Sequence, residues 1–201
     1  MGETVPKSRR VIAWFIDFAL VVAAAALLAV FTFQRISGLL TDVPELAAGG
    51  SWQFLTSQGD VTVAAQGLGE SLWRKAVGYV QQAFVLLAVV TFLYQWACLS
   101  FAGRTLGKAL TGLRVTPRTP RRAALRAAVT TSADVALYAV ACCLLVEGLF
   151  FLSVVCWAAA VALFLLNALP VVTPSRRSLA DRVAGTSVAG VTLPRLARPS
   201  W

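Results

Sequence analysis

The sequence has 201 residues, of which 58% are hydrophobic and only 13% are charged, and its net charge is +9 at pH 7. Because an ordinary soluble domain has about 25% charged residues, this composition is typical of an integral membrane protein. The chain contains no histidine, which excludes Ser-His-Asp and Cys-His nucleophiles and most zinc sites. We therefore expect no enzyme, no cofactor and no metal centre.

The four cysteines lie in apolar runs and form no CxxC pair, so we expect them to be small apolar side chains of a membrane-embedded interior. They are Cys98, Cys142, Cys143 and Cys156.

Four segments are apolar over about 20 residues, the length needed to cross a bilayer. The first two are residues 11–33 and 79–101. The next apolar stretch, residues 127–172, is too long for one crossing and must turn back. Glu147-Gly148 supplies the only charge near its middle and a flexible residue, which predicts helices at 127–146 and 149–170, with Pro170 and Pro174 marking the end. The predicted fold is an all-α bundle of four transmembrane helices in one domain, residues 1–193, followed by a short tail, 194–201.

Basic residues are concentrated on one side of this four-helix path. The loop 102–126 is rich in Arg and Lys and has no acidic residue, and both terminal segments are also basic. The loop 34–77 carries more acidic than basic residues. The positive-inside rule then places loop 102–126 and both termini in the cytoplasm and loop 34–77 outside. We expect the basic residues to contact anionic lipid headgroups, and we expect no nucleic-acid partner.

The segment GRTLGKALTGLRV (103–115) superficially has the form of a phosphate-binding loop. Its spacing is wrong, because three residues rather than four separate Gly103 from Gly107, and Ala109 follows Lys108 where Ser or Thr would bind magnesium. The glycines instead predict a tight connection at the membrane surface. Residues 113–116 and 186–193 are typical of short extended pieces, and we expect them to pair in a small basic cytoplasmic cap.

Four motifs occur in the order RRVIAWFID, GRTLGKALTGLRV, AALRA (123–127) and RRSLADRVAGTSV (176–188). This arrangement resembles the RDD family of bacterial membrane proteins. That family is named for an arginine at the start of the first helix, an aspartate inside it and a second aspartate, which we place after the last helix. The matching residues here are Arg10, Asp17 and Asp181, and Gly103, Gly107 and Lys108 fall in the family's loop motif.

The resemblance implies a multi-pass protein of the bacterial plasma membrane, for which solute transport and sodium/proton exchange have been proposed. Two positions depart from the family pattern. Ala180 lies where a histidine is frequent, and Ala109 lies where a basic residue is common. A proton relay through that histidine therefore cannot apply to this chain.

A polar residue lies at similar depth in each predicted helix, about 8–11 Å from the cytoplasmic end at 1.5 Å per residue. We call these residues the polar layer: Asp17, Gln95, Asp134 and Asn167. In a bundle, such a layer can build a cation, proton or solute site. It can equally hold the helices together by static hydrogen bonds.

Arg10 and Asp17 lie seven residues apart on one helical face, with a vertical gap of about 10 Å. A direct pair would be strained, so we expect Arg10 to pair with Asp181. Asp17 is then expected to meet Arg126, Arg10 of a neighbouring copy, or a water molecule.

Two functions from different classes follow. The first is a small transporter that moves a cation, proton or solute past the polar layer. The second is a non-catalytic accessory or assembly subunit of a larger cell-envelope complex. One set of four helices without an inverted repeat is small for alternating access, which favours a homo-oligomer or a larger membrane complex.

Overall fold

The computed structural model describes residues 7–41, 61–116, 119–168 and 178–190. Within these ranges, four helical segments are long and apolar enough to cross a membrane: Ser8–Leu39, Gly69–Ala102, Pro120–Val146 and Phe150–Ala168. The prediction of four helices that are long and apolar enough to span a membrane is confirmed.

The first two spans form a long antiparallel pair, α1 (Lys7–Thr41) and α3 (Val61–Ala97), and a π-helical turn, η1 (Cys98–Ala102), continues α3. At 1.5 Å per residue, their 35 and 37 residues measure about 53 and 56 Å, well beyond a hydrocarbon core of about 30 Å. The expected loop 34–77 is therefore wrong in part, because residues 34–41 and 61–77 are helical. Neither stretch contains proline, so a helix that has started in the apolar segment continues through them.

The third span is built from α5 (Pro120–Thr131), a π-helical turn, η2 (Ser132–Ala136), and α6 (Leu137–Val146). It begins before the predicted residue 127, so loop 102–126 is shorter than expected. The reason is local: Thr119 Oγ1 accepts a hydrogen bond from Arg122 N, and Pro120 occupies the first helical position. Both features start a helix whether or not the following residues are apolar.

The fourth span, α7 (Phe150–Ala168), returns antiparallel to α6. Gly148 has a φ of 79° in the turn between them, a conformation that favours glycine, so the predicted hairpin tip is confirmed. Tyr138 and Trp157 pack edge to face at 5.2 Å across this hairpin. The expected helix end at Pro170 lies outside the described residues.

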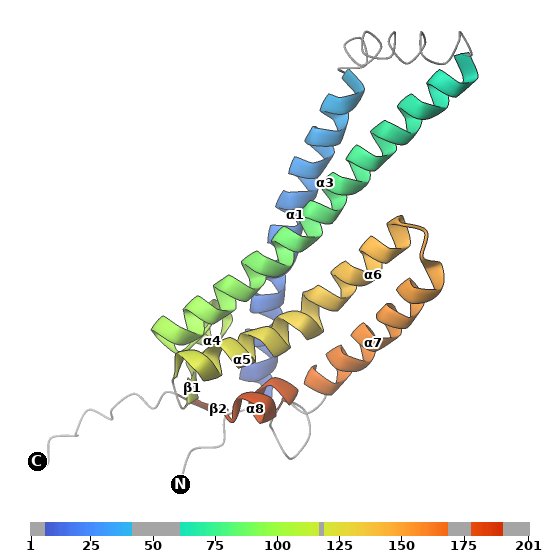
Figure 1. Cartoon of the computed structure of the whole chain (residues 1–201). Coiled ribbons are helices and arrows are strands. Elements are labelled where there is room, and N and C mark those ends of the chain that lie inside the picture. Colours follow the sequence, from blue (N-terminus) through green and yellow to red (C-terminus); the bar gives the residue numbers. More distant parts are fainter. Residues whose placement is uncertain (1–6, 42–60, 117–118, 169–177, 191–201) are drawn as a thin grey trace, which may run out of the picture.

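A small cap lies at one end of the bundle, beside the first turns of α1 (Figure 1). It consists of α4 (Leu106–Leu110), β1 (Leu113–Thr116), α8 (Leu179–Ala184) and β2 (Ser187–Gly190). The strands pair antiparallel, with Leu113 opposite Gly190 and Thr116 opposite Ser187, which confirms the predicted pairing over these residues. Leu113 is buried against Ala13 of α1, so the sheet is anchored on the first span.

Polar contacts connect the spans near the hairpin tip at the opposite end. Gln81 Nε2 on α3 donates to Glu147 Oε1 at 2.5 Å, and Arg35 Nη1 on α1 donates to Gln82 Oε1 at 2.9 Å. From Gln81 to Ala102 the chain rises about 31 Å at 1.5 Å per residue, which matches the hydrocarbon thickness. The residues of α3 that precede Gln81 extend beyond the α6–α7 hairpin (Figure 1).

Candidate functional site

Asp17 lies inside α1 and is fully engaged by the loop that precedes and forms α4. Its Oδ2 accepts a hydrogen bond from Thr105 Oγ1 at 2.5 Å, and its Oδ1 accepts one from Gly107 N at 2.9 Å. Lys108 Nζ lies 3.4 Å from Oδ2 and also donates to Thr105 Oγ1 at 3.0 Å. A carboxylate inside an apolar helix thus has a cation, a hydroxyl and a backbone amide as partners, which offsets much of its desolvation cost.

Gly107 allows this contact because it has no side chain. A Cβ added there would lie 2.2 Å from the carbonyl oxygen of Ala13 and 3.0 Å from the carboxyl carbon of Asp17. Both neighbours belong to α1, and a backbone carbonyl in a helix cannot move aside easily. The Gly-x-x-x-Gly-Lys motif is therefore a docking element, in which Gly107 permits close approach and Lys108 neutralises Asp17.

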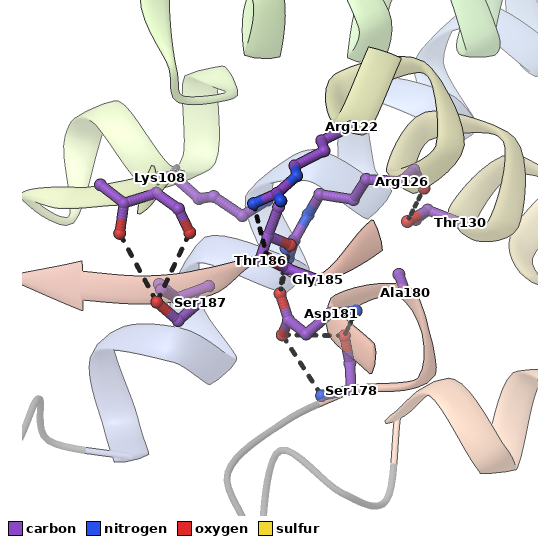
Figure 2. A network of polar contacts seen from close by, with 12 residues as sticks. Lys108, Arg122, Arg126, Thr130, Ser178, Ala180, Asp181, Gly185, Thr186 and Ser187 are labelled. Atoms are coloured by element: carbon purple, nitrogen blue, oxygen red, sulfur yellow. Dashed lines mark hydrogen bonds and ion pairs between the residues drawn. The ribbon is translucent and has the colours of Figure 1, made fainter. Parts of the chain in front are cut away.

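The second signature aspartate, Asp181, forms a buried ion pair with Arg126 Nη1 of α5 (Figure 2). Arg126 Nη1 also donates to Thr186 Oγ1 at 2.8 Å. Asp181 Oδ2 accepts hydrogen bonds from Ser178 N and Ser178 Oγ, which caps the start of α8. Because Arg126 and Asp181 are 7% and 4% exposed, this pair fixes the position of α8 against α5.

The expected partners of the signature residues are corrected here. Asp181 takes Arg126 rather than Arg10, and Arg10 Nη2 donates to Val188 O of β2 at 2.9 Å. Arg126 reaches Asp181 first because α5 packs directly on α8. Within the chain, Asp17 meets Lys108 and not the expected Arg126.

Lys108 is the one cation of the Asp17 contact, and its environment opposes its charge. Desolvation, followed by the nearby positive charge of Arg126, lowers the pKa of Lys108 below 10.5, and Asp17 and Asp181 only partly counter this. The side chain of Lys108 is 19% exposed, so it remains in contact with solvent.

Both contacts border one cavity of about 290 Å³ at the cap end of the bundle. All four members of the polar layer lie on its wall, together with the charged side chains of Arg10, Lys108, Arg126 and Asp181. The wall also includes aromatic side chains, with Trp14 stacked on Phe18 at 5.3 Å and Phe164 at 5.9 Å from Trp14.

The polar-layer residues differ in their burial and in their hydrogen-bond partners. Asn167 Oδ1 accepts a hydrogen bond from Ala180 N at 3.3 Å and so connects α7 to α8. Gln95 is 9% exposed on α3. Asp134 lies in η2, where its Oδ1 is buried and has no hydrogen-bond partner among the described residues. Single π-helical turns are frequent at functional sites because they redirect side chains from a regular helix.

Comparison with models of known protein families identifies the family of this chain. A model of the RDD family matches residues 4–185. This chain belongs to the RDD family. No curated protein and no solved structure matches it. Within this RDD protein the two signature aspartates each hold a different part of the cap: Asp17 holds α4, and Asp181 holds α8.

Two residues of the site were predicted incompletely. Arg126, in the AALRA motif, was expected beside Asp17 and in a loop, whereas it lies on α5 and pairs with Asp181. Thr105, inside the Gly-rich segment, was not singled out. The buried position of Arg126 follows from the earlier start of α5, since an arginine is rarely buried without a partner. Thr105 carries no signal in the sequence, because threonine is common at helix starts.

Proposed function

We propose that this RDD-family membrane protein binds a small cation or a proton at Asp134, and that it moves this ion, or a solute coupled to it, across the membrane. The observation that supports the proposal is the unpaired environment of the Asp134 carboxylate. It is a carboxylate on the wall of a cavity within the membrane-spanning bundle, and its Oδ1 has no partner among the described residues.

The other two carboxylates of the cavity support this choice by contrast. Asp17 and Asp181 are paired with Lys108 and Arg126 and hold the cap. A third carboxylate without such a pair is costly in a membrane protein, and such residues commonly mark ion or proton pathways. Gln95 and Thr130 add polar groups to the same cavity wall.

The proposal includes an orientation in the bacterial plasma membrane, with the cap on the cytoplasmic face. Exposed arginines surround the cap end, where they are suited to anionic lipid headgroups and to the positive-inside rule. They are Arg9, Arg114, Arg121, Arg122 and Arg182. The cavity, which lies at this end, would then exchange with the cytoplasm. The proposal involves no enzymatic step and no cofactor.

Everted membrane vesicles that contain the protein and a pH-sensitive dye test the proposal. Addition of sodium or potassium should move protons in vesicles with the wild-type chain and not in vesicles with Asp134→Asn. Glu147→Gln is the matched control, because Glu147 lies at the hairpin tip and not on the cavity wall. Equal traces from wild type, Asp134→Asn and empty vesicles would refute transport. Asp17→Asn is less informative, since it also releases α4.

A role as an accessory subunit is the second candidate, and a separate observation favours it. Trp73 is 63% exposed on the part of α3 that extends beyond the hairpin tip. Large apolar side chains in such a position suit a partner protein or a second copy. Cross-linking in native membranes followed by purification should return a stoichiometric partner, and a solitary protein would count against this role.

A further inference from the structure

We infer that the ligand of the cavity is a small organic ammonium ion, with its charged group at Asp134 and its apolar part against the aromatic side chains of Trp14, Phe18 and Phe164. This inference rests on the proposed function and names the class of cation. We draw this inference from the volume and the lining of the cavity rather than from any single residue.

The donor set of the cavity is poor for a metal ion. Hard cations such as Mg²⁺ and Ca²⁺ take about six or more oxygen ligands in close arrangement. Among the described residues, no group of three or more His, Cys, Asp or Glu side chains is placed to hold a metal. Two of the three cavity carboxylates already face a protein cation. A single remaining carboxylate satisfies an ammonium group much better than it satisfies a bare metal.

The volume of the cavity also indicates that its ligand is a small molecule rather than a single metal ion. About 290 Å³ is at the lower end of the range for small-molecule pockets. Most small-molecule pockets combine an apolar wall with a few polar groups that fix orientation. This cavity has that composition, because its wall includes Gln95, Thr130 and Asp134 together with aromatic rings.

The aromatic rings face the same space as the carboxylate. Trp14 and Phe18 stack with an interplanar angle of 13°, and Phe164 lies against Trp14 at 58°. Phe164 is on α7, which packs on η2, the turn that carries Asp134. Aromatic rings, tryptophan above all, attract alkylammonium groups through the negative face of the ring, and desolvated sites strengthen the attraction.

The cavity already contains one ammonium group of the protein. Lys108 Nζ lies between Thr105 Oγ1 at 3.0 Å and Asp17 Oδ2 at 3.4 Å. The site therefore pairs a carboxylate and a hydroxyl with an ammonium ion once within the chain. Asp134 and Thr130 bring a second carboxylate and a second hydroxyl to the wall of the same cavity. Because Thr130 Oγ1 donates its proton to Arg126 O at 2.9 Å, its oxygen can still accept from a cation.

Calorimetry of the purified protein in lipid nanodiscs tests the inference with choline and with its neutral analogue, in which carbon replaces the ammonium nitrogen. The two probes have nearly the same shape, so any difference reports charge. We expect choline to bind the wild type at least about tenfold more tightly than the analogue, because its quaternary ammonium, which has no N–H to donate, attracts the carboxylate and the ring faces through its charge. Asp134→Asn should remove this preference, Phe164→Leu should weaken choline binding about fivefold, and Glu147→Gln should change neither.

Equal affinity of the wild type for the two probes would overturn the inference without the need for any variant. An unchanged affinity of Phe164→Leu for choline would overturn the aromatic part of it. If choline does not bind while sodium still drives Asp134-dependent proton movement in vesicles, the organic ligand is wrong and the proposed function stands. If choline does not bind and sodium also drives no Asp134-dependent proton movement, the proposed function is wrong as well. Asp134→Glu, which keeps the charge, should retain choline binding and thus shows that a loss in Asp134→Asn reflects charge rather than misfolding.

Discussion

At the scale of single residues, three aspartates of one cavity have three different environments. Asp17 is held by Thr105, Gly107 and Lys108, and Asp181 is held by Arg126 and Ser178. Asp134 retains a buried oxygen without a partner in the described part of the chain. Since the cost of a charge in a membrane must be offset somewhere, the first two carboxylates are explained by structure and the third points to a ligand.

Gly107→Ala should destabilise the protein by about 1–3 kcal/mol, because the new Cβ would lie 2.2 Å from the carbonyl oxygen of Ala13. The thermal midpoint in nanodiscs measures the effect. Gly78→Ala is the matched control, since nothing lies within 4 Å of its Cβ position in α3. There the helix should gain about 0.5–1 kcal/mol. A Gly107→Ala protein as stable as wild type would refute the close docking of α4.

Arg126→Met should cost about 3–5 kcal/mol of stability, because it leaves Asp181 buried without its cation. Asp181→Asn should be costly for the same reason. The double variant Arg126→Met, Asp181→Asn should be more stable than the sum of the two single losses predicts, since no charge is then stranded. Additive losses across this double-mutant cycle would show that the two residues do not form a pair in solution.

Lys108 gives the stability of the protein a defined pH dependence. Its pKa in the folded protein is lowered below 10.5, so between the lowered pKa and 10.5 the unfolded chain binds more protons than the folded one. Stability should therefore rise with pH across this window. Lys108→Met removes the titrating group, and its thermal midpoint should rise less steeply there. Identical slopes for the two proteins would contradict the burial of Lys108.

At the scale of elements, the apolar runs predicted which segments cross the membrane, but not where each helix begins and ends. The start of α5 is set by Thr119 and Pro120, and these local signals were read as loop because the following arginines are charged. The outer ends of α1 and α3 were read as loop for a similar reason. The apolar content of a segment indicates whether it contacts lipid, whereas the positions at which a helix begins and ends depend on capping residues and prolines.

The partners of the signature residues were beyond prediction for a different reason. Asp17 receives a hydrogen bond from the backbone of Gly107, which is 90 residues away in sequence. Arg126 and Asp181 are 55 residues apart. The depth of each polar residue could be counted along its own helix, which is why the polar layer could be listed. Pairing between elements depends on how the helices rotate against each other, and the sequence alone does not give that rotation.

At the scale of the whole molecule, polar contacts mark both ends of an apolar slab. Gln81 and Glu147 meet at one end, and the cap lies at the other (Figure 1). The exposed apolar side chains between them, such as Val85, Leu93 and Val154, then face lipid. The charge difference between the two ends is what orients the protein in the proposed topology.

Cysteine labelling tests this orientation. In a chain whose four native cysteines are replaced by alanine, Glu147→Cys in intact cells should react with a membrane-impermeant maleimide. Arg121→Cys should react only after the cells are opened, because the proposed orientation puts the cap in the cytoplasm. The reverse pattern would place the cavity on the outer face and invert the proposed path.

Infrared difference spectroscopy of Asp134 tests the central claim most directly. Choline or sodium is passed over a film of the protein in lipid, and the carboxyl bands are compared with and without the cation. The wild type should show a reversible change in the bands of one carboxyl group, absent in Asp134→Asn and retained in Glu147→Gln. Identical difference spectra for wild type and Asp134→Asn would mean that no cation reaches Asp134, and the cavity would then have only a structural role.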